Sequence, residues 1–426
     1  MGYNSIGKAN SDYILQGAHH YFNETELKIK QLVKILILYS YNLKTGDIYM
    51  KIGKLDFKDF AAKKPIGFSP SGKFITAGEV LSEPSLQLGS LLTLTKNQQV
   101  ELTTERYNLE PDFKLGIIGV GLLTKKEIID HVKRQDSFGK TVVEAEMGYC
   151  SELMANINIK PLVLPVSPIK PIPIVPDWKP IKKCMLLKMK TRALFCENTT
   201  DGVTSPFASY RLSHVHPVFA SRGFTVIALT GTNDVRNNFI VEAKNGLTVY
   251  ISGIGHGSYS LYTGNNGNHI LEVGYYDPAE VSGKAIHFLS CQTAGQLGPN
   301  TITKGAKSYL GYTENFHLVW DNAATPVNEF LCFAEADSTF DIAMANGSTA
   351  QQAYNATIAN FNFQLTKPGI PGSAAGTWLK YDRDHCKLLG DGSTVILPYR
   401  YVKICFPLLN LEKENALVAA GELADE

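Results

Sequence analysis

The chain has 426 residues, of which 44% are hydrophobic and 19% are charged. This length exceeds one ordinary compact core, so we expect two or three domains in a globular rather than a disordered protein. The 41 basic and 40 acidic side chains nearly balance. Because no concentrated Lys/Arg patch with interleaved aromatic residues is present either, nucleic-acid binding is disfavoured.

Seven cysteines are scattered without a Cys-x-x-Cys pair or a Cys/His cluster of zinc spacing, so we expect neither a structural metal nor a cofactor. Their odd number and wide scatter suit reduced thiols better than a disulfide framework. Residues 1–16 lack the apolar core of a signal peptide, and the apolar stretch at 32–41 is too short to span a bilayer. These features predict a soluble, cytoplasmic protein.

Residues 161–180 contain seven prolines and mark a boundary. Proline fixes φ and removes a backbone donor, so this segment is predicted to be an extended, semi-rigid connector. An SH3-type ligand or a strap across a neighbouring domain is the alternative. The resulting division has four parts: an accessory domain at 1–160, the linker at 161–180, a second domain at 181–410 and an acidic tail at 411–426.

Residues 1–160 are predicted to be β-rich. A short helix at 24–33 precedes a hairpin with Gly46 in its turn, and a second helix is expected at 125–135. The strand-like runs between turn residues lie at 73–81, 90–96, 99–107 and 114–123. No catalytic constellation occurs here, so this half is expected to serve targeting, assembly or regulation, with a possible partner bound through it.

After the linker, strands and helices alternate. The strands are near-continuous apolar runs, as expected when helices cover both faces of a mostly parallel sheet. Predicted strands lie at 192–198, 224–231, 247–257, 284–293, 305–316 and 386–399. Predicted helices lie at 205–223 (Ser205 as cap), 233–246 and 348–365 (Ser348 and Gln351 as capping box). The fold class is therefore α/β, a doubly wound sheet preceded by a β-rich domain.

Two of these strands end in reactive side chains among small residues. His256 ends "YISGIGH" and Cys291 ends "AIHFLSC". In such sheets the functional crevice lies outside the carboxyl ends of the strands, so neighbouring strands would bring the imidazole and the thiol together. A thiol is mostly protonated at neutral pH, and a nearby imidazole can take its proton and later pass it to a leaving amine. Backbone N–H groups of Gly257 and Cys291 are candidate oxyanion donors.

The order strand–His–Gly, then strand–Cys, resembles the caspase-like cysteine peptidases: caspases, metacaspases, clostripain, gingipains and CHAT domains. Segments "GAKSYLGYTENF", "NGSTAQQAYNATI" and "LLGDGSTVIL" resemble later parts of the CHAT and gingipain-like members, with Gly392 replacing a proline. The resemblance covers about residues 184–400. It implies a cysteine endopeptidase acting on protein or peptide substrates, with His256 and Cys291 catalytic and Gly257 and Cys291 forming the oxyanion hole.

The nucleophile is preceded by Leu-Ser rather than by the Gln-Ala of caspases, so aspartate specificity is not expected. Several non-caspase members select Arg or Lys through an acidic pocket residue; Asp201 is the first candidate here and Glu314 the second. Basic residues within 179–192 would then offer sites for self-cleavage.

Two other classes of function remain open. The peptidase-like domain could be an inactive structural or binding component of a larger assembly, with Cys291 a buried hydrophobic residue. It could also be an acyl transferase that uses the same dyad. His214, His216, His287 and His317 are expected to pack or face solvent rather than bind metal.

Overall fold

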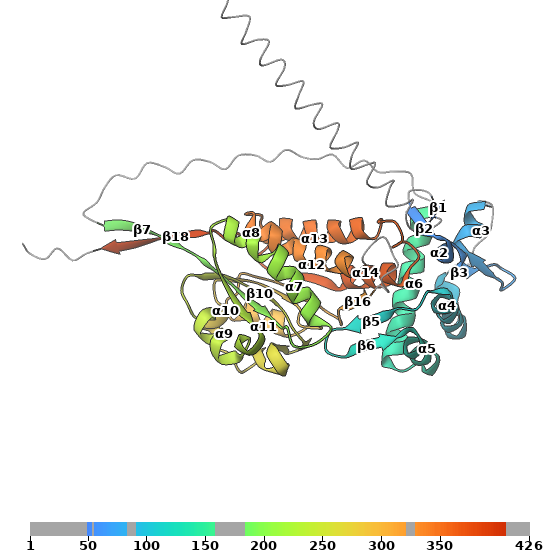
Figure 1. Cartoon of the computed structure of the whole chain (residues 1–426), viewed down its shortest axis with the longest axis horizontal. Helices are drawn as coiled ribbons and strands as arrows, with labels where there is room; N and C mark the ends of the chain where they lie inside the picture. The colour runs from blue at the N-terminus through green and yellow to red at the C-terminus, as the bar shows by residue number, and fades with distance from the viewer. Residues whose placement is uncertain (1–48, 53–54, 83–90, 158–183, 321–328, 406–426) are drawn as a thin grey trace, which may run out of the picture.

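The computed structural model describes residues 49–52, 55–82, 91–157, 184–320 and 329–405. The expected helix at 24–33, the linker, the acidic tail and the first strand of the hairpin at Gly46 lie outside them. The described part has a mixed α/β architecture built on one central sheet (Figure 1).

The central sheet has six strands in the order β17-β15-β14-β10-β8-β9. The first five strands along the chain are parallel, and β17 pairs antiparallel with β15 at one edge. The bounds are β8 (Arg192–Glu197), β9 (Thr225–Thr230), β10 (Thr248–Ile254), β14 (Ala285–Leu289), β15 (Ser308–Tyr312) and β17 (Cys386–Gly390). This confirms the mostly parallel sheet predicted for the second half of the chain.

Helices cover both faces of the sheet because its side chains alternate between two hydrophobic cores. Phe195 and Tyr250 belong to one core, and Leu194 and Ile251 belong to the other. Facing the first core are α7 (Thr204–His214), α8 (His216–Ser221), α12 (Glu329–Ala345), α13 (Ala350–Gln364) and α14 (Ala374–His385). Facing the second are α9 (Arg236–Ala243), α10 (Pro278–Val281) and α11 (Leu297–Thr303).

Two small sheets flank the carboxyl edge of the central sheet. One is formed by β11 (Gly257–Ser258), β12 (Leu261–Thr263) and β13 (His269–Glu272). The other joins the two halves of the chain, in the order β16 (His317–Trp320), β5 (Lys114–Ile117) and β6 (Gly121–Thr124). Short 3-10 turns are η1 (Leu91–Thr93), η2 (Gly231–Asn233) and η3 (Asn265–Gly267).

The β-rich prediction for residues 1–160 is wrong for most of its described part, because residues 96–157 are mainly helical, with only β5 and β6 between the helices. The helices are α2 (Asp59–Lys63), α3 (Ala77–Ser82), α4 (Lys96–Leu109), α5 (Lys125–Arg134) and α6 (Ser137–Ile157). The remaining strands are β1 (Tyr49–Ile52), β2 (Leu55–Lys58), β3 (Pro65–Phe68) and β4 (Phe74–Thr76). Tyr107, Val142 and Tyr149 of this part share the first core with sheet residues from beyond the linker.

Several predicted boundaries shift. The expected helix at 205–223 divides into α7 and α8 at Val215, and its N-cap residue is Val203, which makes no side-chain cap, rather than Ser205. The capping box of α13 uses Thr349 and Gln352, one residue later than predicted. Helices α12 and α14 were not predicted.

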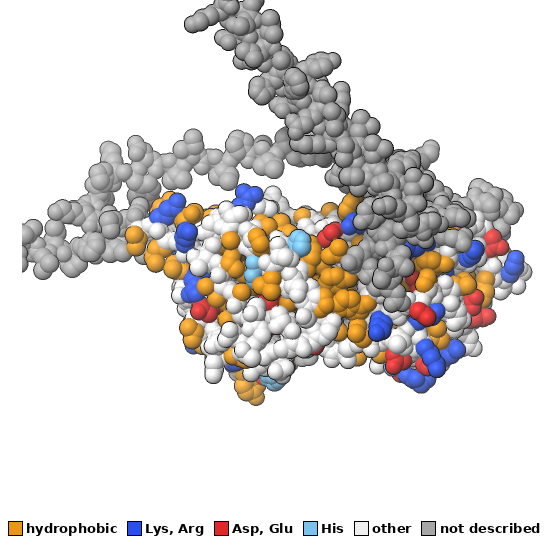
Figure 2. Space-filling model, in the orientation of Figure 1, with side chains coloured by type: hydrophobic (Ala, Val, Ile, Leu, Met, Phe, Trp, Pro, Cys, Tyr) orange, Lys and Arg blue, Asp and Glu red, His pale blue; other side chains and the backbone are white. Residues whose placement is uncertain are grey.

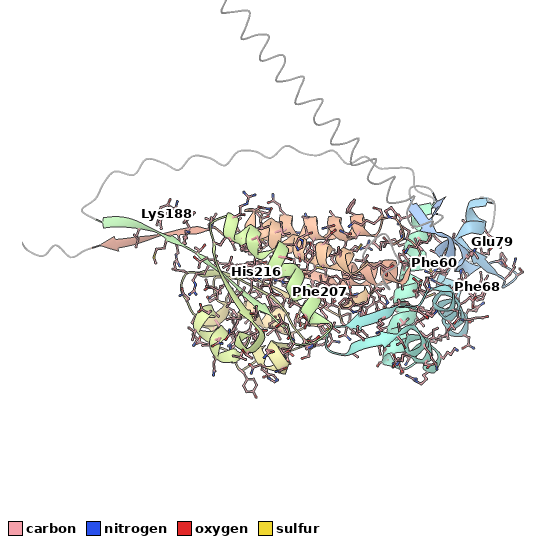
Figure 3. The ribbon with its side chains drawn as sticks, in the orientation of Figure 1. Phe60, Phe68, Glu79, Lys188, Phe207 and His216 are labelled. Atoms are coloured by element: carbon pink, nitrogen blue, oxygen red, sulfur yellow. The ribbon has the colours of Figure 1, made fainter. Side chains whose placement is uncertain are left out.

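A two-stranded ribbon extends from one end of the body (Figure 1). It pairs β7 (Cys184–Lys190) with β18 (Tyr399–Cys405) in antiparallel register. Figure 3 shows Lys188 on this ribbon, at the opposite end of the molecule from Phe60 and Phe68. The Lys188 ammonium lies 3.9 Å from the centre of the Tyr399 ring, a cation–π contact that ties the two strands.

None of the helices in the described ranges is long and apolar enough to cross a bilayer. On the face shown in Figure 2, basic and acidic side chains are dispersed among apolar and uncharged ones rather than gathered into one patch.

Candidate active site

His256 and Cys291 follow neighbouring strands. β10 and β14 pair in parallel, and the last pair in their register is Ile254 with Leu289. His256 stands two residues past Ile254, and Cys291 stands two residues past Leu289. Both residues therefore leave the sheet at the same edge and at the same level, as the sequence predicted for adjacent strands.

The turns that carry the two residues touch at Gly257. A β-carbon at this position would overlap the Ser290 hydroxyl and lie 2.8 Å from the carbonyl oxygen of Cys291. Real β-carbons essentially never approach a backbone oxygen so closely. Only glycine therefore lets the histidine turn pack this tightly against the cysteine turn.

The chain turns sharply immediately after Cys291. Gln292 has a φ of 58°, one of three described non-glycine residues with positive φ. Its N–H donates to the Glu314 carbonyl at 3.0 Å, and the Ala294 N–H donates to the Tyr312 carbonyl at 3.0 Å. Such a conformation costs about 1–3 kcal/mol and persists only where surrounding contacts impose it. This strained turn, which no sequence signal indicated, fixes Cys291 at the edge of the sheet.

Asp201 contacts His256. The Asp201 carboxylate lies 3.0 Å from Nε2 of His256. A carboxylate only accepts hydrogen bonds, so in the neutral ring Nε2 carries the proton and Nδ1 keeps its lone pair. Nδ1 is buried and has no hydrogen-bond partner among the described residues. The ring therefore has the tautomer that a general base needs.

The Asp201 carboxylate is itself held in place at the start of α7. It accepts the Thr204 hydroxyl and the N–H groups of Val203 and Thr204, the latter two at 2.9 Å. Burial alone would raise the pKa of the Asp201 carboxyl, but the bonds from His256, Thr204 and Val203 outweigh it and hold that pKa well below its usual range. Asp201 is thus an ionised partner of the imidazole, a role that the sequence analysis did not assign to it.

The Cys291 thiol is 1% exposed and does not bond to His256. Its Sγ donates to the carbonyl oxygen of Ile118 at 2.7 Å and accepts the N–H of Phe316 at 3.3 Å. Burial raises the pKa of the thiol to about 12, although the Phe316 N–H acts in the opposite direction. In this state the sulfur is a neutral thiol, turned toward the β5–β6 turn.

The β5–β6 turn, residues 118–120, also reaches the imidazole. A β-carbon on Gly119 would lie 3.9 Å from Nδ1 of His256 and 3.9 Å from the Gly257 carbonyl oxygen. The thiol contacts Ile118, and the next residue approaches the ring. Both members of the dyad therefore meet the same short piece of backbone.

A cavity of about 430 Å³ adjoins this turn. Glu314, Gln292 and Tyr381 line its sheet side, and Val120 and His131 line its other side. Asp201 is not among its lining residues, so of the two acidic candidates only Glu314 borders this cavity. A larger cavity of about 870 Å³ lies between α4 and α6 and shares no lining residue with the one beside the cysteine turn.

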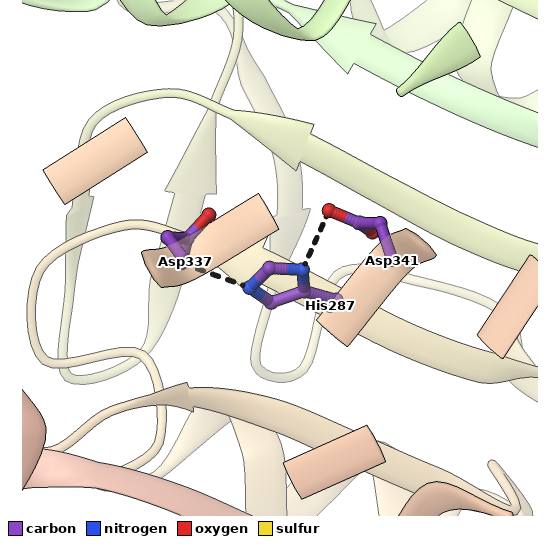
Figure 4. A group of neighbouring side chains, drawn as sticks. All are labelled: His287, Asp337 and Asp341. Carbon is purple, nitrogen blue, oxygen red and sulfur yellow. Dashed lines mark hydrogen bonds and ion pairs between the residues drawn. The ribbon is translucent and has the colours of Figure 1, made fainter. Parts of the chain in front are cut away.

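An ion network lies inside the first core, between β14 and α12 (Figure 4). His287 contacts Asp337 at 3.2 Å and Asp341 at 3.1 Å through its two ring nitrogens. Arg211 donates to Asp341 at 2.7 Å and to Glu197 at 3.0 Å. The network was not predicted: His287 was expected simply to pack.

The three side chains His287, Asp337 and Asp341 also have the types and spacing of metal ligands. Their hydrogen bonding does not fit that role. Asp341 already accepts the Arg211 guanidinium, and Asp337 accepts the Tyr312 hydroxyl at 2.8 Å. Burying a dication beside a fixed arginine is electrostatically unfavourable, so the arrangement fits an ion network.

The other histidines singled out in the sequence have local partners. His214 stacks on Tyr210 with ring centres 4.2 Å apart, and His317 stacks on Trp378 at 3.9 Å. His216 contacts Glu197 at 2.9 Å.

No model of a known protein family and no curated protein matches this sequence. Two solved structures are similar to part of it. One is the Arg-specific cysteine proteinase gingipain R (RgpB), at 9% identity and a TM-score of 0.33, and the other is the complex of Porphyromonas gingivalis RgpB pro- and mature domains, at 11% and 0.34. Each likeness covers 49% of this chain and 48% of the other. So distant a likeness leaves the chemistry of the site to be argued from this chain's own residues.

Proposed function

We propose that this chain is a cysteine endopeptidase of caspase-like architecture, with Cys291 as nucleophile, His256 as general base and Asp201 as the residue that positions His256. The observation that carries the proposal is the Asp201–His256 bond. It leaves a buried, unpartnered imidazole nitrogen beside the backbone segment that the Cys291 thiol contacts.

The proposed reaction has two stages. Nδ1 of His256 takes the thiol proton, and the sulfur of Cys291 bonds to the carbonyl carbon of the substrate, whose π electrons move to oxygen. The carbon–nitrogen bond then breaks as the imidazolium gives its proton to the leaving amine. In the second stage water, deprotonated by His256, attacks the thioester and releases the carboxylic acid and the free thiol. No cofactor or metal is required.

The developing oxyanion needs two hydrogen-bond donors near Cys291. The N–H groups of Gly257 and Cys291 remain our candidates, and the close approach of the Gly257 turn to the Cys291 carbonyl oxygen supports them. Removing one such donor typically costs about 3–4 kcal/mol of transition-state stabilisation. Asp201 stabilises the imidazolium that forms in the same step.

Substrate selection is assigned to Glu314. Its position on the cavity beside Gln292 supports a preference for Arg or Lys side chains, whereas Asp201 is engaged by His256. Self-cleavage at basic residues within 179–192 would be consistent with this preference and stays a prediction. If the Cys291→Ala chain yields the same fragments as the wild type, self-cleavage is excluded.

The buried thiol favours one rival function. A cysteine that is 1% exposed and bonded to a backbone carbonyl also fits an inactive component of a larger assembly. An acyl transferase, the third class considered, would share the dyad but transfer the acyl group to an acceptor other than water.

Peptide cleavage and labelling distinguish these functions. Quenched fluorescent peptides with Arg, Lys, Asp or Leu before the scissile bond are incubated with the intact chain and with the chain whose 118–120 turn has been opened. Both forms are also treated with a peptidyl chloromethyl ketone, and the labelled residue is identified by mass spectrometry. We expect cleavage and labelling at Cys291 that both depend on His256. Absence of Cys291-dependent cleavage in the opened chain would contradict the peptidase.

A further inference from the structure

Strand β5 enters the candidate site from the other half of the chain. It pairs antiparallel with β16, from Lys114 opposite Trp320 to Ile117 opposite His317. The Ile118 N–H extends the ladder by donating to the Phe316 carbonyl at 3.3 Å. The chain thus runs in extended form toward the dyad and reaches it at Ile118.

This segment lies where a bound peptide substrate would lie. The Ile118 carbonyl is at the nucleophile, and Gly119 follows beside the imidazole that would protonate the leaving nitrogen. An extended peptide that adds to an exposed strand edge is a common mode of recognition. Among the described strands β16 pairs only with β5, and the Phe316 N–H just before β16 donates to the Cys291 sulfur, so β5 occupies one edge of a strand that starts at the nucleophile.

The geometry at Ile118 is nonetheless unproductive. Its carbonyl oxygen faces the sulfur at 2.7 Å and accepts the thiol proton. Attack requires the carbon to face the sulfur while the oxygen points at N–H donors. The Val120 N–H donates to the Ile117 carbonyl at 3.0 Å, and this tight turn opposes the required rotation. The hairpin therefore blocks the site without being positioned for cleavage.

We propose that the β5–β6 hairpin is a built-in inhibitor of the candidate active site, and that peptide substrates bind along β16 after β5 has moved away. The proposal rests on the proposed function for the identity of the site. Its test has two separate readouts: access to the Cys291 thiol, which involves no catalysis, and peptide cleavage.

Gly116 offers a way to loosen the hairpin. A β-carbon there would lie 2.9 Å from Cγ of Leu318 and 3.1 Å from Nε1 of Trp320, so a larger residue pushes β5 away from β16. Gly246 is a matched control, because it has open space around its β-carbon position. The test compares Gly116→Val with Gly246→Val in the full chain.

Alkylation by iodoacetamide, followed by peptide mass spectrometry, measures thiol access. We expect Cys291 to react at least tenfold faster in Gly116→Val than in the wild type or Gly246→Val, and cleavage of basic peptides to rise with it. A synthetic peptide of the 114–119 sequence should suppress both gains. If the wild-type chain cleaves peptides as fast as the Gly116→Val variant does, the hairpin is not an inhibitor.

A second variant leaves the sequence of β5 unchanged, so its result does not depend on whether a chain with a substituted β5 folds. Val120 is 65% exposed and Gly121 has open space around it, so a recognition sequence for a site-specific protease can be inserted between them. The chain then folds intact before it is cut. We expect cutting to accelerate Cys291 alkylation, whereas cutting the same insert at Gly246 should not. If alkylation is unchanged after complete cutting at 120–121, the inhibitory hairpin is refuted. If alkylation becomes faster but no peptide is cleaved, the proposed peptidase function is refuted, whereas the hairpin's block of the Cys291 thiol is supported.

Discussion

Ser252 on β10 and His287 on β14 are paired in register, and both contact Asp341. The Ser252 hydroxyl donates to one carboxylate oxygen at 2.7 Å, and the His287 ring lies 3.1 Å from the other. One side chain of α12 thus ties together the two strands that deliver His256 and Cys291. The network therefore links, inside the core, the two strands that end at the proposed dyad.

The first prediction concerns the stability of this network. Asp341→Asn leaves Arg211 and His287 without a full counter-charge inside the protein, and breaking such a pair typically costs about 3–5 kcal/mol. Chemical denaturation should show this loss in the free energy of unfolding. The control is Glu272→Gln, whose partner His269 is exposed, and which should change stability by less than about 1 kcal/mol. Equal effects of the two substitutions would contradict the assigned role.

The second prediction is a pH dependence. Burial lowers the pKa of His287, but Asp341 and Asp337 outweigh it and raise that pKa from 6.5 to about 9. Because the folded state binds the proton more tightly, the stabilisation is fully present below pH 6.5 and is lost as pH rises through about 9. The stability gap between wild type and His287→Gln should therefore narrow between pH 6.5 and 9.5. A gap that stays constant over that range would show that His287 is already neutral in the folded protein.

The third prediction tests Asp201 as a positioning residue in the chain cut at 120–121. Asp201→Asn preserves an acceptor for the Val203 and Thr204 N–H groups. Its amide, however, can donate to Nε2 of His256 as well as accept from it, so the amide no longer fixes which ring nitrogen carries the proton. We expect kcat to fall by about 10³–10⁴-fold with KM little changed, because a comparable substitution in a serine protease acts through the wrong tautomer. A loss confined to KM for basic peptides would instead support the pocket role that the sequence suggested for Asp201.

The fourth prediction concerns Glu314. In the cut chain, Glu314→Gln should lower kcat/KM for Arg and Lys peptides at least tenfold relative to Leu peptides, a difference of about 1.4 kcal/mol. The reason is that Glu314 is the acidic residue that lines the cavity beside Gln292. Glu272→Gln, at a half-buried position that does not line this cavity, should leave the ratio unchanged. If all peptides are affected equally, the cavity does not select the side chain.

Sequence alone predicted the central strands because their runs are apolar on both faces, as at Tyr250 and Ile251, which enter opposite cores. It failed for α4, where residues 99–107 were interpreted as a strand-like run between turn residues. The buried residues Leu102, Thr103, Arg106 and Tyr107 instead follow helical spacing. Local propensity was overridden there by packing.

The position of His256 and Cys291, the proposed dyad, at the ends of neighbouring strands was predicted from the sequence, but their surroundings were not. Asp201 follows β8, and only the order β8-β10-β14 reveals that it lies next to His256. The Ile118 contact joins residues 173 positions apart, so no local pattern encodes it. The Asp201–His256 contact and the Ile118–Cys291 contact are both determined by long-range topology rather than by residue type.

The last prediction tests the contact between the two catalytic turns. Gly257→Ala, in the chain cut at 120–121, puts a methyl group into the Ser290 hydroxyl and near the Cys291 carbonyl oxygen, so the cysteine turn must move. A displacement of about 1 Å can cost a hundredfold in rate, and we expect kcat to fall by that order. Ser290→Ala removes the nearest atom but leaves the carbonyl at 2.8 Å, so the double variant should recover only part of the loss. Full activity in Gly257→Ala would mean that the two turns move independently, and the shared oxyanion site at Gly257 and Cys291 would then have to be abandoned.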